Sequence, residues 1–163
     1  MKAKTCCFTG HRQIPREVLE PLRRKLEETL EELIAQGVVY FGCGGAIGFD
    51  TLAGFAALRL KERYPQIKLI LVLPCRNQDM RWSEAQKADY RELLAGADKI
   101  TYVSEQYFDG CMQKRNRHLA AHSGVCVAYM TRDAGGTAYT VRCARERGVR
   151  VIHLGGEGKF SEK

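Results

Sequence analysis

Long apolar runs are missing from this sequence. The longest candidate, Leu69–Pro74, has the length of a β-strand and falls far short of the roughly 18 residues that a membrane span requires. The N-terminus, MKAKTCCFTG, lacks the apolar segment and cleavage site of a secretory signal. We therefore expect a cytoplasmic protein without a membrane partner.

Paired metal ligands and familiar catalytic motifs are also missing. The seven cysteines are odd in number and none lies in a C-x-x-C arrangement, so the short ligand spacing of a zinc site is absent. No Ser-His-Asp order and no P-loop is visible. Most cysteines lie in apolar runs such as GVCVAYM, where a reduced thiol packs as a small hydrophobe. The sequence predicts no metal site and leaves open whether the protein is an enzyme.

The composition is that of a soluble globular domain. The chain has 163 residues, of which 45% are hydrophobic and 28% charged, a length that suits one hydrophobic core. The net charge of +7 and the pI of about 9.1 favour an anionic partner, which means a phosphate ligand, nucleic acid or an acidic protein. Without a located basic patch, the charge does not choose among these partners or between them and simple solubility.

Short β-branched or aromatic runs alternate with helical patterns along the chain. The runs are mostly continuous, which is typical of strands covered on both faces. They predict strands over Thr5–Thr9, Val38–Cys43, Lys68–Leu73, Lys99–Val103, Val125–Met130 and Val149–Leu154.

The segments between these runs carry helical periodicity. They predict helices over Leu19–Leu33, Asp50–Arg63, Ser83–Leu94, Asp109–His122 and Gly136–Arg147, the first with a start or kink at Pro21 and a stop at Gln36-Gly37. The alternation indicates an α/β fold: a single doubly wound, mostly parallel Rossmann-like sheet with helices on both faces. One domain is expected over residues 1–156, with a frayed tail at 157–163.

Ligands of open α/β sheets bind beyond the carboxyl ends of the strands. The segment GCGGAIGFD lies at such an end, and Gly44, Gly45 and Gly48 precede a helix there, so backbone N–H groups could approach an anion. The spacing is not G-x-G-x-x-G, and a tight turn with Asp50 as an N-cap explains the glycines equally well.

Three other segments reach the same edge: TGHR, PCRNQ and TRDAGGT. Arg12 suits bidentate phosphate contact. On a helix, Arg115 and Arg117 diverge by about 200°, so they cannot both face one site. Trp82 could stack a base, close a lid or plug the core.

The residues predicted to contact a ligand come from these segments and from the helices that follow them. They are Thr9, Gly10, His11, Arg12, Gly44, Gly45, Ala46, Gly48, Asp50, Gln78, Trp82, Arg115, Asn116, Gly135, Gly136 and Thr137.

A combination of motifs between about residues 5 and 154 resembles the YpsA family of the SLOG superfamily. The motifs occur in the order TGHR, GGAIGFD, the stretch from Leu73-Pro74 through Gln78 to Trp82, Asp89-Tyr90, Ala97-Asp98, QKRNRHLAAHS and GGTAYTV. The resemblance implies a Rossmann-like domain that binds a nucleotide-derived ligand of the AMP, ADP-ribose or NAD class, with no other cofactor. It also suggests a homodimer, since dimers are common among the relatives.

The relatives suggest two further activities. GGAIGFDTLAGFAAL and RNRHLAAHSGVCV resemble segments of DprA, in which this fold binds single-stranded DNA. The LOG enzymes hydrolyse a nucleotide N-glycosidic bond with a motif of the form PGGxGTxxE. Here the proline position is Ala134, the third glycine is Ala138 and the glutamate position is Arg142, so the carboxylate of LOG-type hydrolysis is absent.

The leading interpretation is therefore a domain that binds or senses a nucleotide-derived ligand. In it the Gly44–Gly48 loop holds a phosphate that Arg12 or Arg115 neutralises, and Gly135-Gly136-Thr137 holds a second phosphate or the ribose. Asp50 caps a helix or accepts a hydrogen bond from the ribose, and Trp82 or Tyr139 stacks the base. The alternatives are a binder of single-stranded nucleic acid and a hydrolase that uses Asp50 or Glu84.

Overall fold

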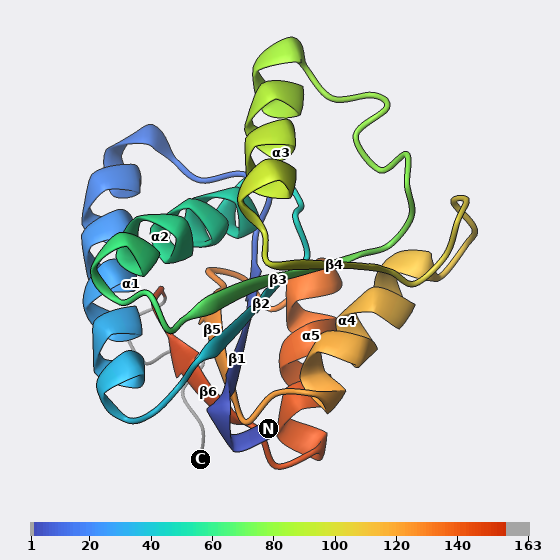
Figure 1. The fold of residues 1–163 in the computed structure, drawn as a ribbon. Helices are drawn as coiled ribbons and strands as arrows, with labels where there is room; N and C mark the ends of the chain where they lie inside the picture. The colour runs from blue at the N-terminus through green and yellow to red at the C-terminus, as the bar shows by residue number, and fades with distance from the viewer. Residues whose placement is uncertain (1, 156–163) are drawn as a thin grey trace.

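Six parallel strands form one sheet in the order β4-β3-β2-β1-β5-β6, as seen in the computed structural model of residues 2–155 (Figure 1). The strands are β1 Thr5–Gly10, β2 Tyr40–Cys43, β3 Lys68–Leu73, β4 Lys99–Tyr102, β5 Val125–Tyr129 and β6 Arg150–His153. The helices are α1 Arg16–Ala35, α2 Phe49–Arg63, α3 Glu84–Gly96, α4 Cys111–Ala121 and α5 Gly135–Glu146, and a 3₁₀ turn precedes β1 at Lys2–Lys4.

The order of the strands creates one switch point. The chain moves outward from β1 to β4 and then returns to the other side of β1, where β5 pairs with it in the register Cys7↔Cys126. Helices α1, α2 and α3 cover one face of the sheet, and α4 and α5 cover the other (Figure 1). The carboxyl ends of β1 and β5 therefore diverge into helices on opposite faces, which opens a crevice between them.

The larger hydrophobic core lies between the sheet and α1 and α2. The buried rings of Phe8 and Phe41 stack at 6.1 Å between centroids, and Phe49 meets Phe8 edge-on at 6.4 Å. A Cβ at Gly10 would lie 2.4 Å from the Phe49 ring, so glycine at the end of β1 lets α2 approach the sheet. All seven cysteine side chains are buried, as expected for small apolar groups.

The predicted α/β fold is confirmed, with each strand and helix found within three residues of its expected ends. Of the start or kink expected at Pro21, the start is wrong and the kink stays a prediction. Helix α1 begins at Arg16 after Pro15, so Pro21 lies in its second turn. The amphipathic stripe that buries Leu22 and Leu26 outweighs the loss of one backbone hydrogen bond.

The tail expected at 157–163 lies outside the described residues. Among residues 2–155, no helix combines the length and hydropathy of a bilayer span.

Candidate functional site

A cavity of about 530 Å³ lies at the switch point, beyond the carboxyl ends of β1 and β5. Its described lining comes from four places: β1 and its following loop, the start of α2, the first turns of α4, and the loop that leads into α5. The residues are Phe8, Thr9, Gly10, His11, Arg12, Gln13, Ala46, Asp50, Met112, Gln113, Arg115, Asn116, Arg132, Ala134, Gly135, Gly136 and Thr137.

Three helices direct their N-terminal ends to this cavity. The residues that cap α2, α4 and α5 are Gly48, Gly110 and Ala134, and none of them provides a side-chain cap hydrogen bond. The first N–H groups of a helix have no intrahelical acceptor and carry the positive end of the helix dipole. The cavity is therefore surrounded by positive partial charge from the backbone alone.

Arginines add full positive charges to the lining. Arg12 and Arg132 are exposed, whereas Arg115 is only 4% exposed. The Arg115 guanidinium is held in place because Nη1 donates to the Gly44 carbonyl at 2.5 Å and Nε donates to Asn116 Oδ1 at 2.7 Å. As expected from their divergence on the helix, Arg117 is exposed and donates instead to the Tyr139 hydroxyl at 2.9 Å.

Asp50 is the acidic residue among the described lining. Its Oδ2 accepts from the Ala46 N–H at 3.2 Å, and α2 begins at Phe49 with Gly48 as the cap, so Asp50 is not the helix N-cap. Burial raises the pKa of this carboxyl, while Arg115, the Ala46 N–H and Arg12 oppose the increase. Glu84, the other acid considered for hydrolysis, lies at the exposed start of α3 and outside the cavity lining.

His11 connects the loops that follow β1 and β5. Its Nε2 accepts from the Thr131 N–H at 3.0 Å, which leaves the proton of the neutral ring on Nδ1. Burial and then the neighbouring Arg132 lower the pKa of this imidazole, so the ring is neutral at pH 7. A neutral His11 adds no charge to the cavity and serves as a hydrogen-bonding group.

The glycines of the Gly44–Gly48 loop make room for the protein's own atoms. A Cβ at Gly44 would lie 2.5 Å from Arg115 Nη1 and 2.8 Å from Asp50 Oδ2. Gly45 has a φ of 67° and faces Leu73, and Gly48 has a φ of 80° with its Cα against the Arg12 backbone. The described lining takes only Ala46 and Asp50 from this segment, so packing within the protein accounts for the glycines.

The second glycine pair has different surroundings. A Cβ on Gly135 would meet no described atom within 4 Å, and one on Gly136 would approach only Asn116 Nδ2, at 3.8 Å. Both residues line the cavity at the first turn of α5. The space next to these backbone groups is open to a ligand.

Gln78 and Trp82 lie behind the Gly44–Gly48 loop and outside the cavity lining. The Gln78 amide nitrogen donates to the Tyr90 hydroxyl at 3.1 Å and to the Gly44 carbonyl at 3.4 Å. The Trp82 ring packs edge-on against Tyr90, with 5.2 Å between centroids. Of the three roles considered for Trp82, its contacts correspond to core packing.

The structure brings eleven of the sixteen candidate residues to the cavity, and Gly44, Gly45, Gly48, Gln78 and Trp82 remain outside its described lining. Arg132 was missed although it follows β5 at the edge that sequence reasoning had singled out. No local pattern indicates that Met112 and Gln113 reach the cavity, because only the placement of α4 brings them there.

Within residues 2–155, no cluster of three His, Cys, Asp or Glu side chains could hold a metal ion.

A doubly wound parallel sheet with a basic cavity at its switch point defines a Rossmann-like architecture. More specifically, the chain belongs to the YpsA family of the SLOG superfamily: the family model described as the YspA SLOG family matches residues 7–150. The chain is 34% identical over 138 residues to the uncharacterized SPbeta prophage-derived protein YoqJ of Bacillus subtilis, a match that covers 77% of this chain and 81% of that protein. It is 28% identical over 129 residues to a UPF0398 protein of Halalkalibacterium halodurans, covering 77% and 68% respectively.

Two solved structures of the DNA processing protein DprA share the fold. The Streptococcus pneumoniae protein superimposes with a TM-score of 0.65 at 20% identity over 93% of this chain and 50% of its own. The Helicobacter pylori protein, described for its single-stranded DNA binding mode, gives a TM-score of 0.66 at 21% identity over 93% and 65%. The chain thus spans half to two thirds of these DprA chains, and at such identity the likeness concerns the fold.

Proposed function

We propose that the switch-point cavity binds a nucleotide-derived ligand and that the N-terminus of α5 holds its phosphate. The observation that carries this proposal is the open, uncapped first turn of α5, which lies in one cavity with Arg12, Arg115 and Arg132. Backbone N–H groups and arginines are the donors that phosphate oxygens prefer. The cavity volume falls in the range of small-molecule sites, which run from about 300 to 1,000 Å³.

Asp50 and His11 supply the polar contacts for the rest of the ligand. A ribose hydroxyl can donate to the Asp50 carboxylate, which already accepts from Ala46 and has a second oxygen. The neutral His11 ring adds hydrogen-bonding capacity without competing for the phosphate. This assignment moves the principal phosphate site from the Gly44–Gly48 loop to the Gly135–Thr137 segment, and the Gly44–Gly48 loop positions Arg115 and Asp50.

The substitution Gly136→Asp tests the phosphate site. A carboxylate in the first turn of α5 is favourable to the helix dipole, so the free variant should melt at the same temperature or slightly higher. It would occupy the anion position and repel phosphate. AMP and ADP-ribose at about 100 times the dissociation constant should stabilise the parent by about 2.7 kcal/mol and leave Gly136→Asp unchanged in a thermal-shift assay.

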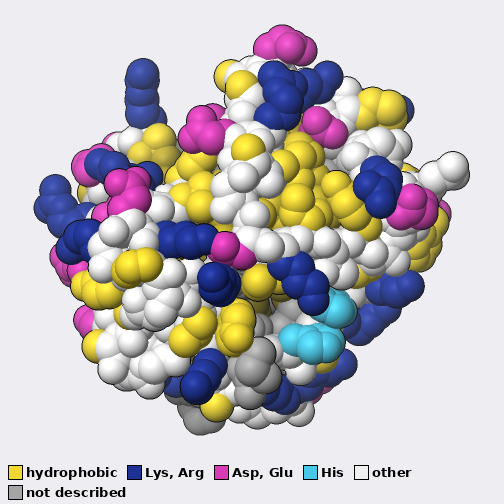
Figure 2. Space-filling model, in the orientation of Figure 1, with side chains coloured by type: hydrophobic (Ala, Val, Ile, Leu, Met, Phe, Trp, Pro, Cys, Tyr) yellow, Lys and Arg dark blue, Asp and Glu magenta, His cyan; other side chains and the backbone are white. Residues whose placement is uncertain are grey.

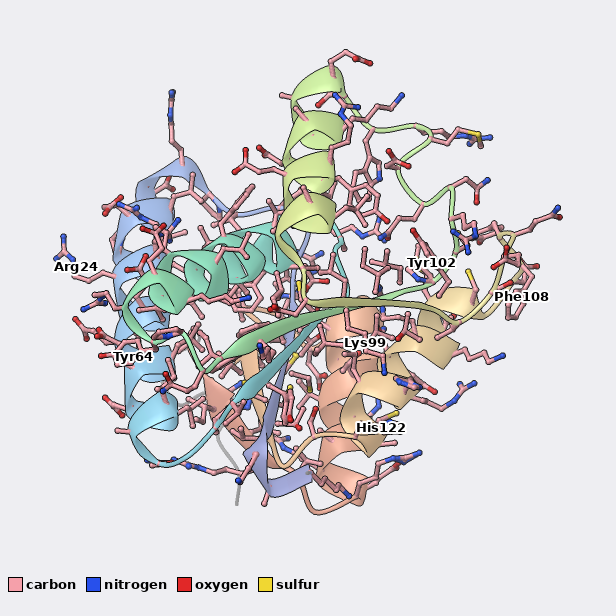
Figure 3. The ribbon with its side chains drawn as sticks, viewed as in Figure 1. Arg24, Tyr64, Lys99, Tyr102, Phe108 and His122 are labelled. Atoms are coloured by element: carbon pink, nitrogen blue, oxygen red, sulfur yellow. The ribbon has the colours of Figure 1, made fainter. Side chains whose placement is uncertain are left out.

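Arg24→Ala provides a control with the same change in net charge. Arg24 is exposed on α1 and extends away from the fold (Figure 3), so this variant should retain the full ligand shift. Equal ligand shifts in the parent and in Gly136→Asp would overturn the assignment of the phosphate site.

A second candidate function is the binding of single-stranded nucleic acid. The fold shared with DprA favours it, as do two exposed aromatic residues, Tyr107 and Phe108, in the loop that leads from β4 into α4. Figure 3 labels Phe108. Unpaired bases stack on exposed aromatic side chains in many proteins that bind single strands. Replacing both aromatic residues with alanine should weaken oligonucleotide binding severalfold and leave AMP binding unchanged if this surface contributes.

A further inference from the structure

A second cavity, of about 390 Å³, lies beside the first on the α1, α2 and α3 side of the sheet. Its apolar wall includes Ile14, Leu19, Ile47, Leu52 and Phe55. Leu19 is 40% exposed, and Ile47 is half-buried at the tip of the Gly44–Gly48 loop. Neither of these two side chains belongs to the hydrophobic clusters of the described core, so their apolar surface is available to a ligand.

The two cavities share Arg12. This residue lines both, so the two cavities adjoin at the loop that follows β1. That segment is fixed to the start of α2, because the Phe49 N–H donates to the His11 carbonyl at 3.1 Å and Gly48 lies directly against the Arg12 backbone. A ligand anchored in the first cavity can therefore reach the second by passing over Arg12.

The polar end of the second cavity comes from α3. Gln86 and Asp89 both line it. The Gln86 side-chain oxygen accepts from the Ser83 N–H at 3.0 Å, which leaves the Gln86 amide NH₂ as a donor, while the Asp89 carboxylate is an acceptor. A flat apolar ring with a donor and an acceptor on one edge, as a nucleobase has, matches these walls.

We propose that this second cavity is the nucleobase site of the ligand whose phosphate occupies the first. The inference rests on the proposed function and extends it: the ligand is a complete nucleotide that spans both cavities, with Arg12 beneath its sugar–phosphate portion. Ile47 and Leu19 cover the faces of the base, and Asp89 and Gln86 contact its edge. Ligands that carry the phosphate and ribose without a base use only the first cavity.

Calorimetric titration of ribose 5-phosphate and AMP tests this division. The parent protein should bind AMP about tenfold or more tightly than ribose 5-phosphate. Leu19→Trp, a substitution at an exposed position, should fill the second cavity and reduce the AMP affinity to that of ribose 5-phosphate without changing the latter. Asp89→Ala, also at an exposed position, should weaken AMP severalfold and leave ribose 5-phosphate unchanged.

Ile100→Trp is the matched control, because Ile100 is 37% exposed on β4 and lines neither cavity. It should leave both affinities as they are. Equal affinities of the parent for the two ligands, or undiminished AMP binding by Leu19→Trp, would overturn the base site while leaving the phosphate site intact. Failure of the parent to bind either compound would instead refute the proposed function itself, and the base site with it.

Discussion

Gly44 lies against two buried charged side chains that come from different helices. Arg115 from α4 donates to its carbonyl, and Asp50 from α2 lies beside Arg115 next to the position that a Cβ on Gly44 would take. The φ of Gly44 is not in the left-handed region, so its backbone would accept alanine. What excludes a side chain here is the position of the Arg115 guanidinium, which would be the nearer group, together with the Asp50 carboxylate.

Gly44→Ala should therefore act through Arg115. The added methyl would displace the guanidinium and break its hydrogen bond to residue 44, at a cost of roughly 1–3 kcal/mol in the free energy of unfolding. Urea denaturation would measure this loss, and Gly136→Ala is the control, since the space beside Gly136 is open. Equal losses in the two variants would mean that Arg115 is not the cause.

The sequence alone does not predict contacts between residues that lie far apart along the chain. The sequence singled out Gly44 and Arg115, but 71 positions separate them, and no local pattern indicates that one makes room for the other. The glycine spacing therefore suggested phosphate contact, whereas the packing assigns the space to Arg115. The position of Gly135 and Gly136 at a helix start was predictable because that signal is local, and their contact with a ligand stays a prediction.

At the level of elements, the fold was predictable because its signals are local. Continuous runs such as Lys68–Leu73 indicated buried parallel strands, and Ser83 with Gln86 forms the capping box that begins α3. Helix α1 was the exception. Its stripe of leucines continues through Pro21, and the pattern of burial determines the helix more strongly than one unfavourable residue.

Pro21→Ala should stabilise the protein. Alanine restores an N–H that can donate to the Glu17 carbonyl one turn earlier, and Pro21 is exposed, so no packing is lost. Proline also restricts the unfolded chain, and its removal gives back part of that stabilisation. We therefore expect a net gain of about 1–2 kcal/mol in the free energy of unfolding. Thermal unfolding should show an increase of at least about 2 °C, against little change for the exposed control Glu28→Ala. A lower melting temperature would show that α1 requires the proline.

At the scale of the whole molecule, the distribution of the positive charge bears on the choice of partner. On the face drawn in Figure 2, Lys and Arg side chains are interspersed with Asp and Glu, and ion pairs such as Arg59–Glu27 and Arg76–Glu105 engage part of the basic surface. The arginines of the switch-point cavity are instead gathered around one small volume. This distribution fits a compact anion better than a long polyanion.

Salt dependence separates these two partners. Each phosphate of a single strand that the protein neutralises contributes about −0.7 to the slope of log affinity against log salt concentration. Oligonucleotide binding that covers four or more phosphates should therefore fall about a hundredfold or more between 50 and 300 mM salt, while AMP binding should change only a few fold. Fluorescence polarisation and calorimetry would measure the two. An oligonucleotide that binds more tightly than AMP and loses affinity steeply with salt would contradict the preference for a compact anion.

The return of the chain from β4 to the far side of β1 divides the protein at a single exposed loop, residues 103–110. The part before this loop contributes Arg12 and Asp50 to the cavity, and the part after it contributes Arg115, Arg132 and the start of α5. If the chain were cut there and the fragments expressed separately, neither would hold a complete site. A nucleotide bridging them would join the fragments, so their reassembly could serve as a sensor of the ligand's concentration.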